Sequence, residues 1–185
     1  PYARAEARGG RWLFGIPSPS SMSPTCDSAD CVVPTLLATD GPHFAGHAEI
    51  DSLGKMFYWL VPARTIDPSI APVIVVLEGG PGMSVDYQVF GGCGPYRLDA
   101  SGNVTANEHT WASFSTLLFI DQPLGVGYST LDPGYAGPTN STANAEQMYE
   151  LLDYVFTLHP EYQPDQAAGR PLYIFGHSYA ARPAP

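Results

Sequence analysis

A serine flanked by small residues lies near the end of the sequence, in the segment Gly176-His177-Ser178-Tyr179-Ala180. The spacing G-x-S-x-small is typical of a nucleophile elbow, a tight strand-to-helix turn that exposes a serine hydroxyl above the edge of a sheet. In that turn, the backbone N–H of the next residue points toward the same place. An ordinary Gly-Ser turn after a strand has the same pattern, so the interpretation depends on the surrounding elements.

A second glycine-rich turn, Glu78-Gly79-Gly80-Pro81-Gly82, follows an apolar run in the first half of the chain. Glycines at the carboxyl end of a parallel strand let backbone N–H groups approach a ligand closely. In a hydrolase, one such N–H joins the N–H after the nucleophile and stabilises the oxyanion. A phosphate-binding loop is excluded, because neither G-x-x-x-x-G-K-[ST] nor G-x-G-x-x-G is present. A purely structural turn remains the alternative.

Three apolar segments are expected to bring the two turns together. Residues 72–77, 116–120 and 172–175 are continuous apolar runs, which are typical of central strands covered on both faces. The first run ends at the glycine-rich turn, and the third ends at Gly176. We therefore predict that these runs are buried strands of a sheet that is at least partly parallel.

Two further patterns complete the predicted framework. The segments 47–50 and 55–61 are rich in β-branched and aromatic residues and flank a hairpin-type connection. A helix is predicted over residues 143–158, with Ser141 or Thr142 as its cap. Strand, helix and strand in this order predict a βαβ unit within a mixed, mostly parallel α/β sheet. The predicted apolar stripe of the helix consists of Ala145, Met148, Leu152 and Val155.

The composition predicts a folded domain and excludes several classes of partner. The chain has 185 residues, of which 44% are hydrophobic, and a formal net charge of −10. This hydrophobic content is enough for a packed core, whereas the negative charge argues against nucleic acid or an anionic membrane as a partner. No apolar run approaches the ~20 residues of a membrane helix. We expect an irregular N-terminal segment over residues 1–40 and one domain over residues 41–185.

The cysteines and the glycosylation sequons favour an oxidising compartment. Cys26 and Cys31 stand five positions apart between turn-forming residues, where a local disulfide is sterically reasonable. A zinc site is disfavoured there, because no second ligand pair follows at a suitable spacing. Cys93 has no obvious mate, and Asn103 and Asn140 each begin an N-x-S/T sequon in a turn-rich stretch. Together, these features indicate the secretory pathway.

Four blocks of the sequence resemble the serine carboxypeptidases of the vacuolar/lysosomal family, peptidase family S10. The third block is the most specific, because it contains the Trp, Asp-Gln-Pro and Gly-x-Gly-[aromatic]-Ser spacings of that family. The resemblance implies an α/β-hydrolase fold and a Ser–Asp–His triad that needs no cofactor. In that fold, the strands at residues 72–77, 116–120 and 172–175 are expected to be parallel and adjacent, with the last as an apolar edge strand because its outer neighbour belongs to the missing half. It also implies release of C-terminal amino acids from peptides or proteins in an acidic compartment. The four blocks are residues 56–64, 73–82, 108–129 and 173–180, and the resemblance extends from about Phe44 to Ala180.

The family resemblance also implies roles by position. Ser178 resembles the nucleophile, and the backbone N–H groups of Gly80 and Tyr179 resemble the oxyanion hole. The triad order in this fold is Ser, Asp, His, and Ser178 stands seven residues before the end. We therefore expect this chain to be the N-terminal half of a hydrolase domain that lacks the Asp and His of the triad. Expressed alone, it is expected to be inactive.

The chain departs from the family pattern where the substrate carboxylate is bound. Glu78 replaces an asparagine, His177 replaces a glutamate, and a further glutamate of the family is Gly92 here. The resemblance assigns substrate binding to Glu78, Gly79 and His177, and Met83 replaces a cysteine of the family. An ionised Glu78 is expected to repel a substrate carboxylate, whereas a protonated His177 is expected to bind one. Binding by His177 requires a pH near or below the ~6.5 of a free histidine.

The altered carboxylate site leaves other functions open. A related acyltransferase or esterase would not need to recognise a terminal carboxylate. In an aminopeptidase of the proline-iminopeptidase type, Glu78 would hold a substrate amine, although the long third block favours the carboxypeptidases. A catalytically inactive, glycosylated binding protein is the alternative that is not an enzyme.

Overall fold

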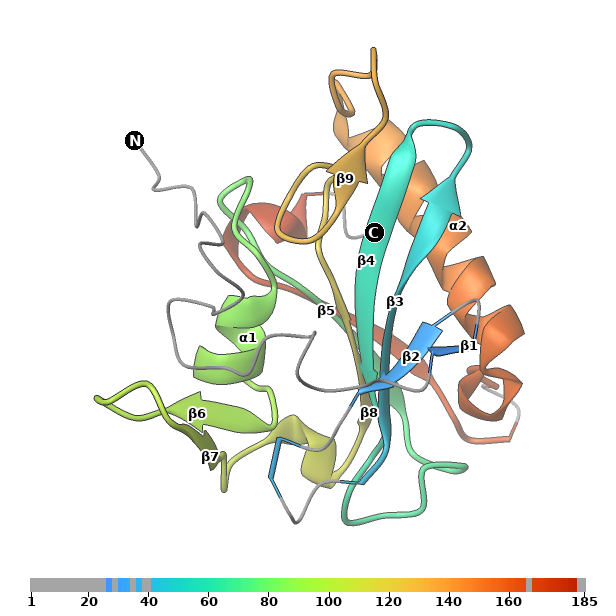
Figure 1. The fold of residues 1–185 in the computed structure, drawn as a ribbon. Coiled ribbons are helices and arrows are strands. Elements are labelled where there is room, and N and C mark those ends of the chain that lie inside the picture. Colours follow the sequence, from blue (N-terminus) through green and yellow to red (C-terminus); the bar gives the residue numbers. More distant parts are fainter. Residues whose placement is uncertain (1–25, 28–29, 34–35, 38–40, 166–167, 183–185) are drawn as a thin grey trace.

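The computed structural model describes residues 26–27, 30–33, 36–37, 41–165 and 168–182, which form a mixed sheet with helices on both faces (Figure 1). The strand order is β1-β2-β3-β4-β8-β5-β10, with β9 beside β4 and a separate β6–β7 hairpin. The strands are β1 (Cys26–Asp27), β2 (Asp30–Val33), β3 (His43–Ile50), β4 (Gly54–Val61), β5 (Val73–Leu77), β6 (Tyr96–Leu98), β7 (Val104–Ala106), β8 (Thr116–Ile120), β9 (Thr130–Leu131) and β10 (Leu172–Gly176). The α-helices are α1 (Asp86–Gly91) and α2 (Ser141–Leu158), and the 3-10 helices are η1 (Trp111–Ser113), η2 (Pro160–Tyr162) and η3 (Ser178–Ala181).

Three adjacent parallel strands lie where the sequence predicts them. β5 pairs in parallel with β8 on one side and with β10 on the other. Every residue of β5 and β8 is buried, because α2 covers one face of the sheet and α1 with its neighbouring loops covers the other. The α/β fold with a mixed sheet is confirmed. Its parallel part is smaller than expected, since the other pairings of this sheet in the described residues are antiparallel.

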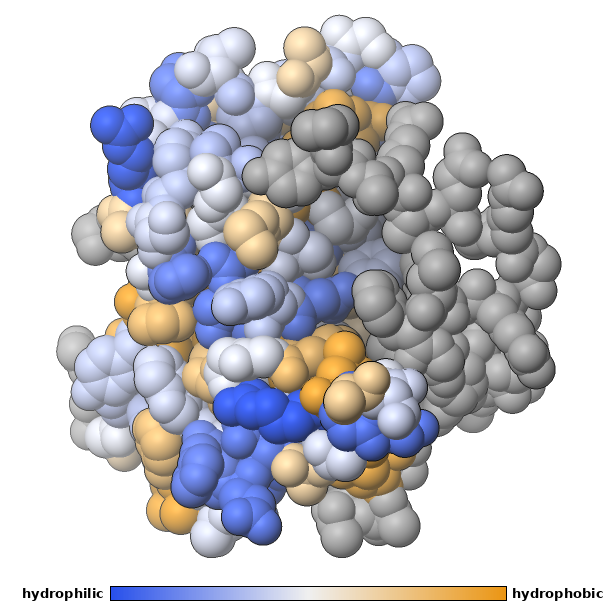
Figure 2. All heavy atoms as spheres, turned by 90° about the vertical axis from the view of Figure 1, so that its left-hand side faces the viewer, coloured by the Kyte–Doolittle hydropathy of each residue, from blue (hydrophilic) through white to orange (hydrophobic). Residues whose placement is uncertain are grey.

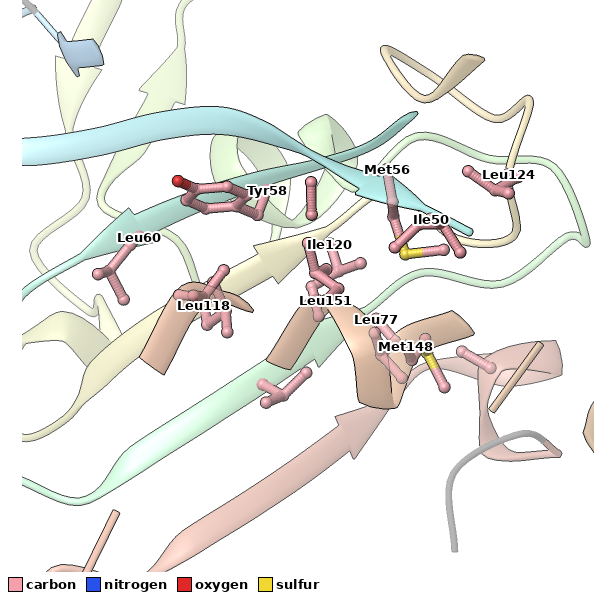
Figure 3. Packing of buried hydrophobic residues seen from close by; sticks show 14 residues of the cluster. Ile50, Met56, Tyr58, Leu60, Leu77, Leu118, Ile120, Leu124, Met148 and Leu151 are labelled. Atoms are coloured by element: carbon pink, nitrogen blue, oxygen red, sulfur yellow. The ribbon is translucent and has the colours of Figure 1, made fainter. Parts of the chain in front are cut away.

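Two hydrophobic clusters, one on each face, fix the sheet to its helices. Side chains alternate along β5, so that Val75 and Leu77 lie in the cluster with α2, whereas Ile74 and Val76 lie in the cluster with α1. Figure 3 shows the α2 cluster, in which Leu151 packs against side chains of β4, β5 and β8. Burial of this apolar surface fixes the position of β5, whose carboxyl end leads into the glycine-rich turn.

The sheet extends further toward the N-terminus than predicted. β3 begins at residue 43 rather than at 47, and it forms the expected hairpin with β4. β1 and β2 lie within residues 1–40, so the prediction of irregular structure is wrong for these two strands. Both are short, and their hydrogen-bonding partners lie in β2 and β3, which a local sequence pattern does not reveal. Residues 1–25 lie outside the described residues.

Helix α2 covers the predicted span with a different cap and a shifted buried face. Asn140 is the cap, because its Oδ1 accepts a hydrogen bond from the Ala143 N–H at 2.9 Å. The prediction of Ser141 or Thr142 as the cap is therefore wrong. Two members of the predicted stripe are buried, whereas Ala145 and Leu152 are only partly buried. The buried residues of α2 are Asn144, Gln147, Met148, Leu151 and Val155.

The exposed surface includes an open sheet edge. β10 ends the strand order, as predicted, and within the described residues it pairs only with β5. Figure 2 shows the side on which α1 lies, where hydrophobic residues form several separate patches among hydrophilic ones. No helix in the described part of the chain is long and apolar enough to span a membrane.

Candidate active site

Ser178 lies in a sharp turn at the carboxyl end of β10. Its φ of 56° falls in the left-handed region, which is uncommon for residues other than glycine. The N–H of His177 still donates to Leu77 O at 3.1 Å, and η3 begins one residue later at Ser178. The chain thus changes from strand to helix within two residues and leaves Ser178 exposed. This is the strand–turn–helix geometry that the elbow pattern requires.

The glycine-rich turn packs directly against this serine turn. Leu77 and Gly176 are partners in the parallel register, so the two turns leave the sheet at the same level. A Cβ added at Gly79 would lie 2.7 Å from His177 O, 2.8 Å from Tyr179 N and 2.9 Å from Ser178 Cβ, so only glycine fits there. The N–H groups of Gly80 and Tyr179 donate to no other described residue.

Glu78 and His177, the two substituted positions, are hydrogen-bonded to each other. Glu78 Oε1 lies 2.6 Å from His177 Nδ1, and it also accepts the Gly79 N–H at 2.7 Å. Gln88 Nε2 donates to the other carboxylate oxygen, Oε2, at 2.6 Å. Glu78 is only 2% exposed, whereas the His177 side chain is 53% exposed. The carboxylate is therefore turned into the protein, and the imidazole lies at the surface beside Ser178.

The electrostatics of Glu78 favour its charged form. Burial raises the pKa of Glu78, but the hydrogen bonds from the Gly79 N–H, His177 and Gln88 lower it by more, so the net pKa lies below its ordinary value. Because Glu78 is ionised and can only accept, Nδ1 of His177 carries the proton in this hydrogen bond. A buried carboxylate that is already surrounded by donors is poorly placed to bind a substrate amine. This argues against the aminopeptidase alternative.

Gln88 is a site residue that the sequence analysis missed. It lies in the short helix α1, is 5% exposed and matches no motif. A Cβ added at Gly92 would overlap Gln88 Oε1, so the Gln88 side chain fills the space where a residue at position 92 would begin its own side chain. The absence of a side chain at Gly92 therefore makes room for the side chain of Gln88.

A second chain of hydrogen bonds links the glycine-rich turn to α2. Gln122 Nε2 donates to Glu78 O at 2.9 Å, and Asn144 Nδ2 donates to Gln122 Oε1 at 2.6 Å. Gln122 lies in the Asp-Gln-Pro segment that supported the family resemblance, but the sequence analysis assigned it no role. These bonds fix the backbone of Glu78 from behind the sheet.

Two carboxyl groups lie at the start of α1. Asp121 is fully buried and accepts the N–H groups of Val85 at 2.7 Å and Tyr128 at 2.8 Å. Burial raises the pKa of Asp121 despite these hydrogen bonds. Burial and the nearby charge of Asp121 raise the pKa of Asp86 to about 7. No sequence motif marked this pair.

The other predicted site residues lie away from this centre. Cys31 is disulfide-bonded, and the register of β1 and β2 sets it opposite Cys26, while Cys93 is a buried free thiol. Asn103 lies in the turn between β6 and β7, and Asn140 lies at the cap of α2. Glycosylation at both asparagines stays a prediction.

The described residues supply no partner for the Ser178 hydroxyl. No described side chain forms a hydrogen bond with Ser178 Oγ, and the adjacent His177 uses its Nδ1 to bind Glu78. Among the described residues, no group of three or more His, Cys, Asp or Glu side chains could hold a metal ion. The site therefore contains an exposed serine, a glycine-rich turn with available N–H groups and a carboxylate–histidine pair.

The structure is that of an α/β hydrolase, since it combines a mixed α/β sheet with an exposed serine in a strand-to-helix turn and a glycine-rich turn beside that serine. A family model for serine carboxypeptidases matches residues 34–185, and the chain belongs to this family. The structure of Kex1(Δ)p, a prohormone-processing carboxypeptidase from Saccharomyces cerevisiae, superposes with a TM-score of 0.66 at 25% identity, covering 80% of this chain and 35% of that one.

Curated relatives agree with this assignment. The probable serine carboxypeptidase CPVL of Mus musculus is 36% identical over 146 residues, which cover 77% of this chain and 29% of the relative. The pheromone-processing carboxypeptidase KEX1 of Phytophthora infestans is 37% identical over 132 residues, which cover 69% of this chain and 22% of the relative. The chain thus spans less than a third of the length of either relative.

Proposed function

We propose that Ser178 is the nucleophile of a serine carboxypeptidase that removes amino acids from the C-termini of peptides or proteins. The observation that supports this most directly is the packing of the Gly79–Gly80 turn against the left-handed turn at Ser178. In this arrangement the serine is exposed, and two N–H groups without a described partner lie beside it.

The proposed chemistry is acyl transfer to the serine. The Ser178 oxygen attacks the carbonyl carbon of the last peptide bond, its proton passes to a base, and negative charge develops on the carbonyl oxygen. The N–H groups of Gly80 and Tyr179 stabilise that oxyanion. The C–N bond then breaks, the base protonates the leaving C-terminal amino acid, and water hydrolyses the acyl-enzyme to regenerate the serine. The hydroxyl needs a base, and no described side chain is bonded to it, so we place the Asp and His of the triad in a part of the protein beyond these residues.

Recognition of the substrate is assigned to the exposed side of the Glu78–His177 pair. A protonated His177 donates from Nε2 to the terminal carboxylate of a peptide, while Glu78 neutralises the ring from the buried side. We assign this function to the secretory pathway or a vacuole. The disulfide at Cys31 and the sequons at Asn103 and Asn140 support such a location. No cofactor is needed for these steps.

The experiment compares the natural full-length protein with its Ser178→Ala variant. A fluorophosphonate probe should label the wild type and not the variant, and only the wild type should shorten a peptide from its free C-terminus. Ser101→Ala, at an exposed serine in the turn between β6 and β7, serves as the matched control and should keep both properties.

Three results would overturn the proposal, and each would identify a different kind of protein. Absence of labelling in the wild type would identify an inactive homologue. Labelling with equal turnover of free-acid and amidated peptides would identify an enzyme that no longer selects C-termini. Labelling with turnover of esters alone would identify an esterase or acyltransferase.

A further inference from the structure

We propose that Gln88 is a positioning residue for substrate recognition: it holds Glu78 turned inward, and thereby fixes His177 with its Nε2 edge toward the substrate. This inference rests on the proposed function, because it concerns the same site. It is based on the geometry around Glu78, in which Gln88 and His177 donate to different carboxylate oxygens.

The two carboxylate oxygens of Glu78 accept hydrogen bonds from different donors. Oε1 accepts from both Gly79 N and His177 Nδ1, whereas the described donor to Oε2 is Gln88 Nε2 at 2.6 Å. Without Gln88, a buried oxygen would lose this donor, and a carboxylate in that state rotates, takes up a proton or admits water. The orientation that keeps Oε1 toward His177 therefore depends on the bond at Oε2.

The Gln88 side chain is tightly packed. Gln88 is 5% exposed, and its Oε1 occupies the place where a Cβ at Gly92 would be. Its backbone carbonyl accepts the N–H groups of Gly92 at 3.2 Å and Gly94 at 2.8 Å, so the loop after α1 is wrapped around this one residue. The backbone of Gln88 is thus fixed by the loop, and its side chain lies against Gly92, which places Nε2 at the Glu78 carboxylate.

The hydrogen bond to Glu78 also sets the orientation of the His177 ring. Its Nδ1 is committed to Glu78, so the ring offers Nε2 to a ligand. A protonated ring donates Nε2–H to an anion, whereas a neutral ring with its proton on Nδ1 offers only a lone pair there. Holding the ring by Nδ1 therefore determines which atom meets the substrate.

The pH at which Glu78 takes up a proton depends on the groups around it. His177 is the described charged group that acts on Glu78, and the charges of Glu78 and Arg97 act in turn on Cys93. Burial raises the pKa of the Cys93 thiol to about 11, so this group stays neutral under acidic conditions. Loss of the Gln88 hydrogen bond removes one of the interactions that lower the pKa of Glu78. Glu78 then takes up a proton at a higher pH and releases His177.

The kinetic test uses Gln88→Met, which keeps the volume of the side chain and removes its amide. In the full-length enzyme, we expect KM for a free-acid peptide to rise about tenfold at pH 4.5 and less at pH 6.5, with kcat unchanged. KM for the amidated peptide should stay the same. Gln147→Met removes another buried amide, which donates to Tyr135 OH at 2.8 Å, and should leave all of these values unchanged.

A loss of kcat at constant KM, or an equal rise in KM for both peptides, would overturn the inference. So would the same change in Gln147→Met, because it would indicate general destabilisation.

A second readout does not depend on turnover. Nitrogen-15 NMR of the histidine rings reports which ring nitrogen holds the proton, and His177→Asn identifies the signal. The wild type should show the proton on Nδ1 of the neutral ring, and Gln88→Met should show a mixture of the two tautomers. An unchanged tautomer would overturn the inference even in a protein without peptidase activity. Absence of peptidase activity together with the expected tautomer change would instead overturn the proposed function alone.

Discussion

Glu78 remains an anion in a buried position because three donors surround it. A carboxylate whose pKa is lowered in the folded state stabilises the protein above the pKa of the unfolded state, near 4.3, and loses that contribution as the pH falls further. The hydrogen bonds to Glu78 therefore keep it ionised at a lower pH than an ordinary glutamate. This revises the expectation that Glu78 opposes His177, since the carboxylate is bound to the ring and shielded from the substrate.

The stability contribution of Glu78 can be measured directly. Glu78→Gln removes the charge and converts one acceptor oxygen into a donor that faces buried donors, so we expect a loss of about 1–3 kcal/mol at pH 6. The difference from the wild type should shrink as the pH falls from 5 to 3, where the wild type also loses the charge. Urea unfolding at several pH values measures this, with the exposed Glu108→Gln as control. A difference that grows toward low pH would contradict the assigned ionisation.

Exchange of the two site residues tests their dependence on each other. His177→Glu alone would place two carboxyl groups in contact, so one must hold a proton and the variant should lose stability as the pH rises from 4 to 7. The double variant Glu78→Asn with His177→Glu removes this repulsion and should recover most of the loss. Melting temperatures of the two single variants and the double variant, measured at pH 4.5 and 7, give the coupling. Additive effects at both pH values would show that the two residues do not interact.

At the scale of elements, the start of α1 should respond to pH in the opposite direction. Asp86 has a folded-state pKa of about 7, whereas its unfolded value is about 3.9, so the folded state holds a proton that the unfolded state has lost. The stability contribution of Asp86 is therefore fully present below about pH 4 and is lost as the pH rises through 7. Asp86→Asn removes this effect and should stabilise the protein by about 2–4 kcal/mol at pH 7.5, with little change at pH 4.

Thermal unfolding of Asp86→Asn at the two pH values measures this effect. Asp153→Asn, at an exposed position of α2, is the control for removal of one negative charge. Equal stabilisation by both variants at pH 7.5 would assign the effect to the net charge of −10 rather than to the pair with Asp121.

Elements buried on both faces were predictable, and contacts between distant elements were not. β5 and β8 are continuously apolar because helices cover both sides of the sheet, so their sequence reports their environment. The cap of α2 was misassigned because Asn, Ser and Thr at 140–142 all have suitable side chains, and only the backbone of Asn140 is in the extended conformation of a cap. Gln88 was missed because its role arises from a hydrogen bond to a residue ten positions away across a turn.

At the scale of the whole molecule, the site depends on long-range pairing. Glu78 and His177 are 99 positions apart, and only the parallel register of β5 and β10 brings them into contact. The serine turn and the glycine-rich turn could be recognised from their local patterns, because each follows a strand. Their contact followed from the family resemblance and the βαβ order rather than from either pattern alone. Formation of the site is therefore coupled to the docking of β10, the outermost strand of the described sheet.

That outermost strand gives the last prediction. Leu172 and Tyr173 of β10 are 37% and 55% exposed, and the strand pairs only with β5 within the described residues. An apolar edge with unpaired backbone groups favours pairing with another chain. We expect the 185-residue chain, expressed alone, to associate at micromolar concentration. Tyr173→Lys should reduce this association several-fold, because a charge at the edge disfavours close pairing. Sedimentation velocity measures it.

The control for this experiment is Tyr149→Lys, at a tyrosine of α2 that is 72% exposed and belongs to a helix rather than to the open edge. Both substitutions change the net charge by the same amount, so a difference between them isolates the position on β10 from the general effect of charge. A wild-type chain that stays monomeric at ~100 μM and melts in one sharp, reversible transition would contradict the prediction. Equal reduction of association by both variants would show that the contact between chains lies elsewhere than at β10.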